Sequence, residues 1–378
     1  MEKSPKNFET WKESELLPPD KENIAQGWQK EVAQNIRSGE SLIKTLSDLG
    51  IVITDAEKNT IIETMKERSL NIPKQYFIDL FQSVSDEKEI SQVKNILLPN
   101  IEPEAFSFDS LTSVEETPNP DKNPVEGLTR MYPDRVLISP THQCMTYCQW
   151  CFREKESKAL SNTQLEKIFN YIGKDKRISD VILTGGEPLL ISDKRLESIL
   201  ENLRKIEHVD IIRFHTRAPV VLPSRIDANL LNILEKNKDV GKPIYVVTQI
   251  VHPLELRDQT VSAIHRLVEH GIPVFNQFPV LKGINDDQET FNNLMTKSIK
   301  YSIKPYYAIA PIAREGMNIR FFVSVEKVQE LVNEYSRNHD GLGRPTVIVP
   351  VMGKKLTPEQ LQDAQEKGIH LRHTKTNI

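Results

Sequence analysis

The sequence predicts an α/β protein built on a partial (βα)6 TIM-like barrel, with a helical N-terminal region before it and a C-terminal segment after it. Two observations predict this class. Six strand-like runs alternate with helical patterns between residues 135 and 311. Ahead of the barrel, apolar residues recur largely at three- and four-residue steps, which is the spacing of amphipathic helices.

The N-terminal region, residues 1–96, is expected to start with a loose polar arm up to about residue 24 and to continue as helices. Thr54-Asp55 and Ser85-Asp86 are the expected helix starts. We expect packing and oligomerisation from this region. Residues 97–134 are expected to form an extended connector, because prolines interrupt any helical period there: Pro99, Pro103, Pro118, Pro120 and Pro124.

The barrel is expected over residues 135–311, with parallel strands joined by right-handed crossovers. The predicted strands are Val136–Ser139, Val181–Thr184, Ile211–His215, Ile244–Ile250, Val274–Phe278 and Tyr306–Ala310. The predicted helices between them cover about 162–174, 193–206, 226–236, 256–270 and 287–301. In the segment 312–378, a helix at about 325–338 and a strand at about 345–351 precede a charged tail.

Composition excludes several classes of protein. The net charge is -4 with no strong basic stripe, which argues against a nucleic-acid partner. The longest apolar runs have the length of strands, so no membrane span is expected. The polar N-terminus shows no signal peptide, and a cytoplasmic location is expected.

The three cysteines of the chain, Cys144, Cys148 and Cys151, lie together at C-x3-C-x2-C spacing after the first predicted barrel strand. Three thiolates can hold three irons of a [4Fe–4S] cluster and leave the fourth iron open to S-adenosylmethionine (SAM). A structural zinc ion would need a fourth ligand, such as His142. A disulfide is disfavoured for an odd set of cysteines in a reducing compartment. The spacing resembles that of the radical-SAM superfamily.

The run Gly185-Gly186-Glu187-Pro188 follows the second predicted strand. Glycines let a backbone approach a ligand closely, and Glu187 can accept a hydrogen bond from an ammonium group. By itself the run is also an ordinary β-to-α turn. One strand after the cysteines, it resembles the radical-SAM motif that receives the SAM amino group. Polar residues at later strand ends are expected at the barrel mouth with cofactor and substrate: His215, Thr216, Arg217, Gln249, His252, Glu255, Asn276 and Gln277.

From about Trp28 to Pro358 the chain resembles the lysine 2,3-aminomutase family. The matching runs are Gly127–Thr129, Tyr132–Leu137, Arg217–Pro223, His252-Pro253 with Glu255, Asn276-Gln277, Gly283–Asp286 and Pro305–Tyr307. The resemblance implies a cluster, SAM and pyridoxal phosphate (PLP), and the movement of an amino group between the α- and β-carbons of an amino acid. It also implies an electron donor such as flavodoxin or ferredoxin, and a homo-oligomer.

The resemblance assigns roles residue by residue. Arg135 would pair with the PLP phosphate, Tyr132 would lie beside PLP, and Arg153 would bind the substrate carboxylate. The lysine that holds PLP in the family corresponds best to Lys354, with Lys355 as the alternative. Here the glycine run that precedes it shrinks to Met352-Gly353.

Three positions depart from the family. Met131 stands where the family often has a second phosphate-binding arginine, and Ile312 and Pro350 stand where two aspartates hold the distal amine of lysine. An amino acid other than lysine is therefore the expected substrate, unless Glu315 supplies the carboxylate; Arg314 and Arg320 would suit an acidic side chain. The alternatives are a PLP-independent radical-SAM enzyme on the same scaffold and a non-catalytic cluster or zinc protein.

Overall fold

The computed structural model describes residues 27–67, 71–99, 123–146, 148–151, 159–238, 241–311, 319–351 and 354–366. The expected N-terminal arm and most of the proline-rich stretch lie outside these residues. Within the described ranges, no helix is long and apolar enough to cross a membrane.

Five helices make up the described N-terminal region: α1 (Gly27–Ala33), α2 (Gly39–Asp48), α3 (Asp55–Glu67), α4 (Lys74–Gln82) and α5 (Glu87–Leu97). Both predicted starts are confirmed. The Thr54 hydroxyl accepts from the Glu57 backbone N–H at 3.1 Å while the Glu57 carboxylate accepts from that of Thr54 at 2.6 Å, a reciprocal cap at the start of α3. The Asp86 carboxylate caps α5 by accepting from the Glu89 N–H at 2.8 Å.

One curved sheet forms the centre of the molecule, and its strands follow one another in sequence order. They are β1 (Leu128–Tyr132), β2 (Arg135–Ile138), β3 (Asp180–Leu183), β4 (Ile211–His215), β5 (Ile244–Thr248), β6 (Val274–Pro279), β7 (Ile303–Ile309), β8 (Thr346–Val351) and β9 (Lys354–Leu356). Strands β2 to β8 are parallel, and antiparallel β1 and β9 flank them. The predicted barrel strands are confirmed as β2 to β7.

The sheet is wider than predicted at both edges. The strand expected near 345–351 becomes β8 and continues the parallel barrel beside β7. Strand β1 forms inside the expected connector and pairs with β2, so the predicted boundary at residue 134 falls within a β-hairpin. In β1 one buried residue is followed by four half-buried ones. Buried and exposed residues do not alternate there, so the sequence lacks the pattern that predicts a strand. A short helix, α13 (Pro358–Glu366), also occupies part of the expected tail.

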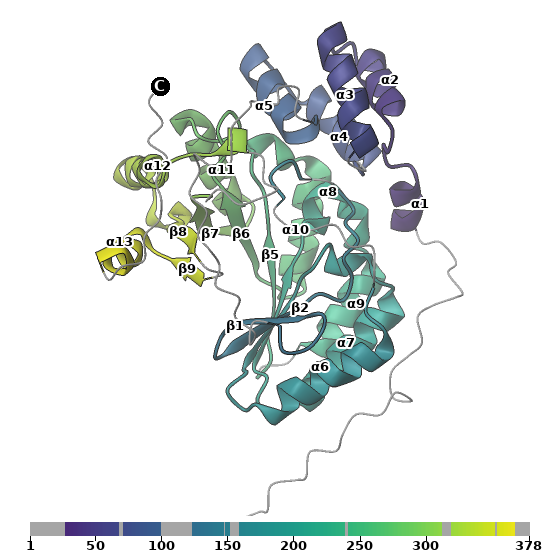
Figure 1. Cartoon of the computed structure of the whole chain (residues 1–378), viewed down its shortest axis with the longest axis vertical. Coiled ribbons are helices and arrows are strands. Elements are labelled where there is room, and N and C mark those ends of the chain that lie inside the picture. The colour runs from purple at the N-terminus through teal and green to yellow at the C-terminus, as the bar shows by residue number, and fades with distance from the viewer. Residues whose placement is uncertain are drawn as a thin grey trace, which may run out of the picture.

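Helices cover the outer side of the barrel (Figure 1): α6 (Asn162–Lys174), α7 (Asp193–Lys205), α8 (Ala218–Val221), α9 (Ala228–Asn237), α10 (Asp258–Glu269), α11 (Gln288–Lys300) and α12 (Val325–Asn338). On β4, Ile212 and Phe214 are fully buried, while Arg213 and His215, which alternate with them, are half-buried. Successive strand residues point to opposite faces. We therefore assign Arg213 and His215 to the inner face of the barrel.

The two edges of the sheet meet. The phenol oxygen of Tyr132, the last residue of β1, accepts a hydrogen bond of 2.7 Å from the backbone N–H of Lys355 in β9. These residues are 223 positions apart in the chain. In Figure 1, the yellow β9 lies close to the blue β1. This contact brings the C-terminal segment against the start of the barrel.

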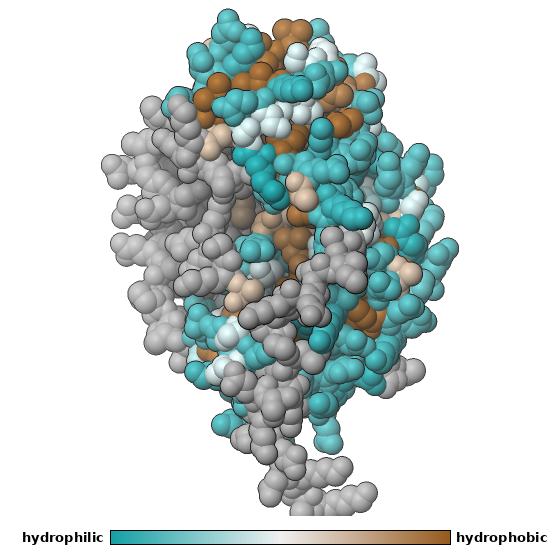
Figure 2. Space-filling model, turned by 90° about the vertical axis from the view of Figure 1, so that its right-hand side faces the viewer, coloured by the Kyte–Doolittle hydropathy of each residue, from teal (hydrophilic) through white to brown (hydrophobic). Residues whose placement is uncertain are grey.

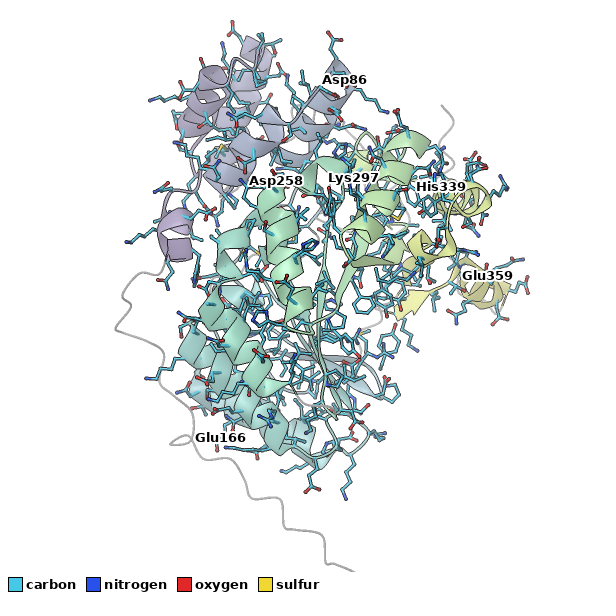
Figure 3. The ribbon with its side chains drawn as sticks, turned by 180° about the vertical axis from the view of Figure 1, so that it is seen from behind. Asp86, Glu166, Asp258, Lys297, His339 and Glu359 are labelled. Atoms are coloured by element: carbon cyan, nitrogen blue, oxygen red, sulfur yellow. The ribbon has the colours of Figure 1, made fainter. Side chains whose placement is uncertain are left out.

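The N-terminal helices dock on the end of the barrel where the strands finish. The Arg257 guanidinium, just before α10, contacts the Asp79 carboxylate of α4 at 2.6 Å. Figure 3 shows Asp258, the first residue of α10, at the end of that helix nearest the N-terminal helices. Since active sites of such barrels lie at the carboxyl ends of the strands, the N-terminal region covers the expected mouth. Figure 2 shows apolar residues at the top of one face, where these helices lie. Val52, between α2 and α3, is 84% exposed.

Candidate active site

The cysteine loop begins after β2, at the carboxyl end of the first parallel strand, as predicted. Cys144 is exposed, and Cys148 and Cys151 are partly exposed. Two asparagines from the N-terminal region hold the loop by its backbone. The Asn35 amide donates to the Met145 carbonyl at 3.0 Å, and the Asn71 amide donates to the Cys144 carbonyl at 2.7 Å.

The Gly185-Gly186 pair packs against the backbone that leads into the cysteine loop. The Gly186 N–H donates to the Thr141 carbonyl at 2.9 Å. A Cβ on Gly186 would lie 2.2 Å from the Gln143 carbonyl oxygen, and one on Gly185, whose φ is +105°, would lie 2.5 Å from that of Thr141. The sequence suggested close approach of a ligand, whereas here the close approach is to the protein's own chain. Pro188 follows as the first residue of a single 3-10 turn, Pro188–Leu190.

Glu187 is 4% exposed, and its carboxylate ties the ends of β3 and β4 together. It accepts from the Thr216 hydroxyl at 2.5 Å, the Arg217 N–H at 3.0 Å and the Leu189 N–H at 3.1 Å. Burial raises the pKa of this carboxyl, and the three donors oppose the shift. Its predicted contact with the SAM amino group remains a prediction.

Arg217 contacts one of the three cysteines directly. One terminal nitrogen of its guanidinium (Nη1) lies 2.9 Å from the Cys148 sulfur, and the other (Nη2) donates to the Glu255 carboxylate at 2.5 Å. Its Nε donates to the Gln249 carbonyl at 3.2 Å. Tyr76 from α4 donates to the same Glu255 oxygen at 2.6 Å. This network joins the cysteine loop to β4, β5 and the N-terminal helices.

The remaining polar groups around the cysteine loop fit a sulfur-rich ligand. Gln149 lies between two of the cysteines and is 5% exposed, and its side-chain N–H₂ group has no hydrogen-bond partner among the described residues. The side-chain oxygen of Gln249 accepts from the Trp150 indole N–H at 3.2 Å. A buried donor without an acceptor is costly unless a ligand supplies one, and the sulfurs of an iron–sulfur cluster accept such bonds.

No three His, Cys, Asp or Glu side chains of the described residues converge on a single point that would hold one metal ion. A cluster does not require this, because each thiolate binds a different iron atom. A mononuclear zinc site does require it.

A second polar group lies around Lys355, on the inner face of the barrel. The Lys355 ammonium nitrogen donates to the Gln277 side-chain oxygen at 2.6 Å and lies 4.8 Å from the centre of the Tyr307 ring. Burial, followed by the charges of Arg213 and Arg135, lowers the pKa of Lys355 to about 7. An amine with this pKa is largely unprotonated just above neutral pH, and this is the form that attacks a carbonyl.

Two arginines face this lysine. The Arg135 guanidinium lies 4.5 Å from the centre of the Tyr132 ring and pairs with Asp134 at 3.0 Å. Arg213 from β4 pairs with Asp180 from β3 through two of its N–H groups. The structure therefore places Arg135 and Tyr132 beside Lys355, and their contacts with PLP stay predictions.

The other predicted site residues lie elsewhere. Lys354 is exposed, while its neighbour Lys355 is the inward-facing lysine. His252 is 1% exposed, with one ring nitrogen 3.0 Å from the Gln92 oxygen and the other accepting from the Leu254 N–H at 3.2 Å. The cofactor roles predicted for Lys354 and His252 gain no support from these positions. Arg153, Ile312, Arg314, Glu315, Met352 and Gly353 lie outside the described residues.

Sequence reasoning missed Arg213 and Tyr76. Alternation along β4 puts Arg213 on the same face as His215, so the inner-face pattern was available as a signal. Tyr76 lies on the buried face of α4 and is 2% exposed. No sequence pattern distinguishes it from an ordinary core residue.

The sequence of this chain is similar to those of known proteins. The model of the Radical SAM superfamily matches residues 138–295, which span the cysteine loop and the barrel strands β3 to β6.

Relatives narrow the class. L-lysine 2,3-aminomutase of Methanococcus maripaludis is 33% identical over 81% of this chain and 69% of its own length. That of Fusobacterium nucleatum is 32% identical over 86% of this chain and 74% of its own. Glutamate 2,3-aminomutase of Clostridioides difficile is 35% identical over 65% of this chain and 58% of its own. The chain belongs to the lysine 2,3-aminomutase-like family of radical SAM enzymes, and it is an enzyme of the isomerase kind.

Proposed function

We propose that this enzyme is a 2,3-aminomutase that uses a [4Fe–4S] cluster, SAM and PLP to act on an amino acid other than lysine. The observation that carries the proposal is Lys355, an inward-facing lysine with a pKa lowered to about 7, opposite Arg135 and Tyr132. An amine in this state is suited to forming an imine with a carbonyl compound such as PLP.

Cys144, Cys148 and Cys151 are the proposed cluster ligands. Gly185, Gly186, Glu187 and Gln249 surround the loop that carries these cysteines, and we propose that SAM binds there. When bound, the cluster and SAM would supply a 5′-deoxyadenosyl radical, which can take a hydrogen atom from the substrate. The chain's own contribution is to hold the loop by its backbone and to enclose it under the N-terminal helices.

For PLP we propose Lys355 as the covalent anchor, in place of Lys354. When bound, PLP supplies a carbonyl group that can take up the substrate nitrogen. Tyr132 fixes the backbone of Lys355 and offers the face of its ring, while Arg135 is the phosphate partner. We propose Arg213 as the second phosphate-binding arginine, since position 131 holds a methionine. The charge of Arg213 already lowers the pKa of Lys355.

The exclusion of lysine as substrate rests on Pro350. In the antiparallel pair β8–β9, Pro350 lies directly opposite Lys355, so their side chains share one face of the sheet. A carboxylate at this position would face the site, and proline supplies none. One relative is named glutamate 2,3-aminomutase. Arg320 is the described residue expected to suit an acidic side chain, and its guanidinium lies over the Phe321 ring at 4.5 Å.

We also propose that the enzyme is cytoplasmic and takes electrons from a donor such as flavodoxin or ferredoxin. We propose a homo-oligomer too, which the apolar residues over the N-terminal helices favour (Figure 2). We propose a small-molecule substrate, and neither a nucleic acid nor a membrane as a partner.

The test is to trap PLP with borohydride on the anaerobically reconstituted protein and to map the labelled peptide. We expect label on Lys355, loss of label in Lys355→Met, and retained label in the matched control Lys354→Met. An intact cluster that cleaves SAM in a protein that takes up no PLP would overturn the aminomutase proposal in favour of a PLP-independent enzyme.

A further inference from the structure

We propose that Arg217 is a fixed N–H···S donor to the cluster thiolate of Cys148 and raises the reduction potential of the cluster. The inference rests on the proposed cluster and adds a role for a residue that does not bind iron. The contact itself is the 2.9 Å approach of Nη1 to the Cys148 sulfur.

Arg217 is held in place at all three of its nitrogens. Besides the sulfur, the guanidinium donates to the Gln249 carbonyl at 3.2 Å and to the Glu255 carboxylate at 2.5 Å. Its side chain is 11% exposed. A guanidinium fixed at both ends cannot turn towards another acceptor without leaving a buried partner unpaired.

Glu255 is the anchor of this arrangement. It is 0% exposed, and its second oxygen accepts from the Val251 N–H at 2.6 Å and the His252 N–H at 3.3 Å. The first oxygen receives Tyr76 and Arg217 together. A fully buried carboxylate needs such a set of donors, so it fixes the position of Arg217 strongly. Through Tyr76, the N-terminal helix α4 takes part in this positioning.

The electrostatic consequence has a definite sign. Reduction adds one negative charge to the cluster. A hydrogen bond and a positive charge at a coordinating sulfur stabilise the more negative state, so they raise the potential. The Glu255 charge offsets part of the charge of Arg217, but it binds the guanidinium through a different nitrogen from the one at the sulfur. Arg217 thus acts on the cluster through the Cys148 sulfur, and it shifts the reduction potential without binding iron.

The test compares Arg217→Met with Arg257→Met in the reconstituted full chain without SAM, by EPR-monitored potentiometric titration. Arg257 is a matched control, because it is a buried arginine beside the same Tyr76 ring at 5.0 Å and its guanidinium binds the Asp79 carboxylate instead of a cysteine sulfur. We expect a midpoint more negative than wild type in Arg217→Met and a wild-type midpoint in Arg257→Met. An unchanged midpoint in Arg217→Met, or equal shifts in both variants, would overturn the inference.

A second measurement covers the case in which Arg217→Met does not assemble a cluster. Resonance Raman spectra of the wild-type protein in H₂O and D₂O report exchangeable hydrogen bonds to the cluster sulfurs. We expect an isotope shift of the iron–thiolate band, and its absence would refute the N–H···S bond. If the wild-type chain itself takes up no iron, the proposed function fails. If the cluster is intact and only the SAM affinity falls in Arg217→Met, the present inference alone fails.

Discussion

The pKa of Lys355 leads to a prediction about the pH at which PLP attaches. An ordinary lysine has a pKa near 10.5, and that of Lys355 is lowered to about 7. At pH 7 roughly half of the Lys355 side chains would be unprotonated, against about one in three thousand for an ordinary lysine. Only the unprotonated amine attacks the carbonyl of PLP. We therefore expect attachment about a thousand times faster at Lys355 than at an exposed lysine.

The sign of the pH dependence follows from the same shift. Below pH 7 the amine is protonated, and the rate should fall about tenfold for each pH unit. Above pH 7 the rate should level off. The assay is the rate of borohydride-stable PLP incorporation between about pH 5.5 and about 9, in wild type and in Lys355→Met. A rate that keeps rising through pH 9, as for an ordinary lysine, would refute the reasoning, as would unchanged incorporation in Lys355→Met.

Three further substitutions test the supporting structure. Gly186→Ala places a Cβ 2.2 Å from a backbone carbonyl, so iron content should drop, whereas Gly241→Ala meets nothing within 4 Å and should load normally. Tyr132→Phe removes the hydrogen bond to the β9 backbone, and urea denaturation should show a loss of about 1 kcal/mol with weaker PLP binding. Asp79→Asn leaves Arg257 buried without its counter-charge, so the free energy of unfolding should fall by about 3 kcal/mol, while cluster content persists.

Much of the barrel could be predicted because its signals are local. The helix predicted at 162–174 matches α6, where Ser161 and Gln164 form a reciprocal cap at the start. Strands β2 to β7 matched because each is a short apolar run bounded by turns. β1 was assigned to the connector, because a half-buried edge strand lacks the apolar run that marks a central one.

The candidate site was only partly predictable, because its contacts join distant segments. The choice between Lys354 and Lys355 depends on which side chain β9 turns inward, and that follows from its register with β8. Arg213 lies near Arg135 because β4 is two strands away from β2, which carries Arg135. Neither relation is visible in local sequence. The cysteine spacing, by contrast, is local, so the sequence alone was enough to indicate the class of enzyme.

The polar group around Lys355 and the polar group around Cys148 lie at different depths of the same barrel, and an arginine on or just after β4 lies near each. Arg213, beside Lys355, lies within β4, and Arg217, beside Cys148, lies four residues further along the chain. Between Arg213 and His215 the strand rises by roughly 7 Å at about 3.3 Å per residue. Arg217 lies beyond the end of β4, so the two groups are separated along the barrel. His215 lies halfway and faces the same side as Arg213. We therefore predict that the substrate's reacting carbons lie beside His215, between the proposed cluster site and Lys355, the proposed anchor for PLP.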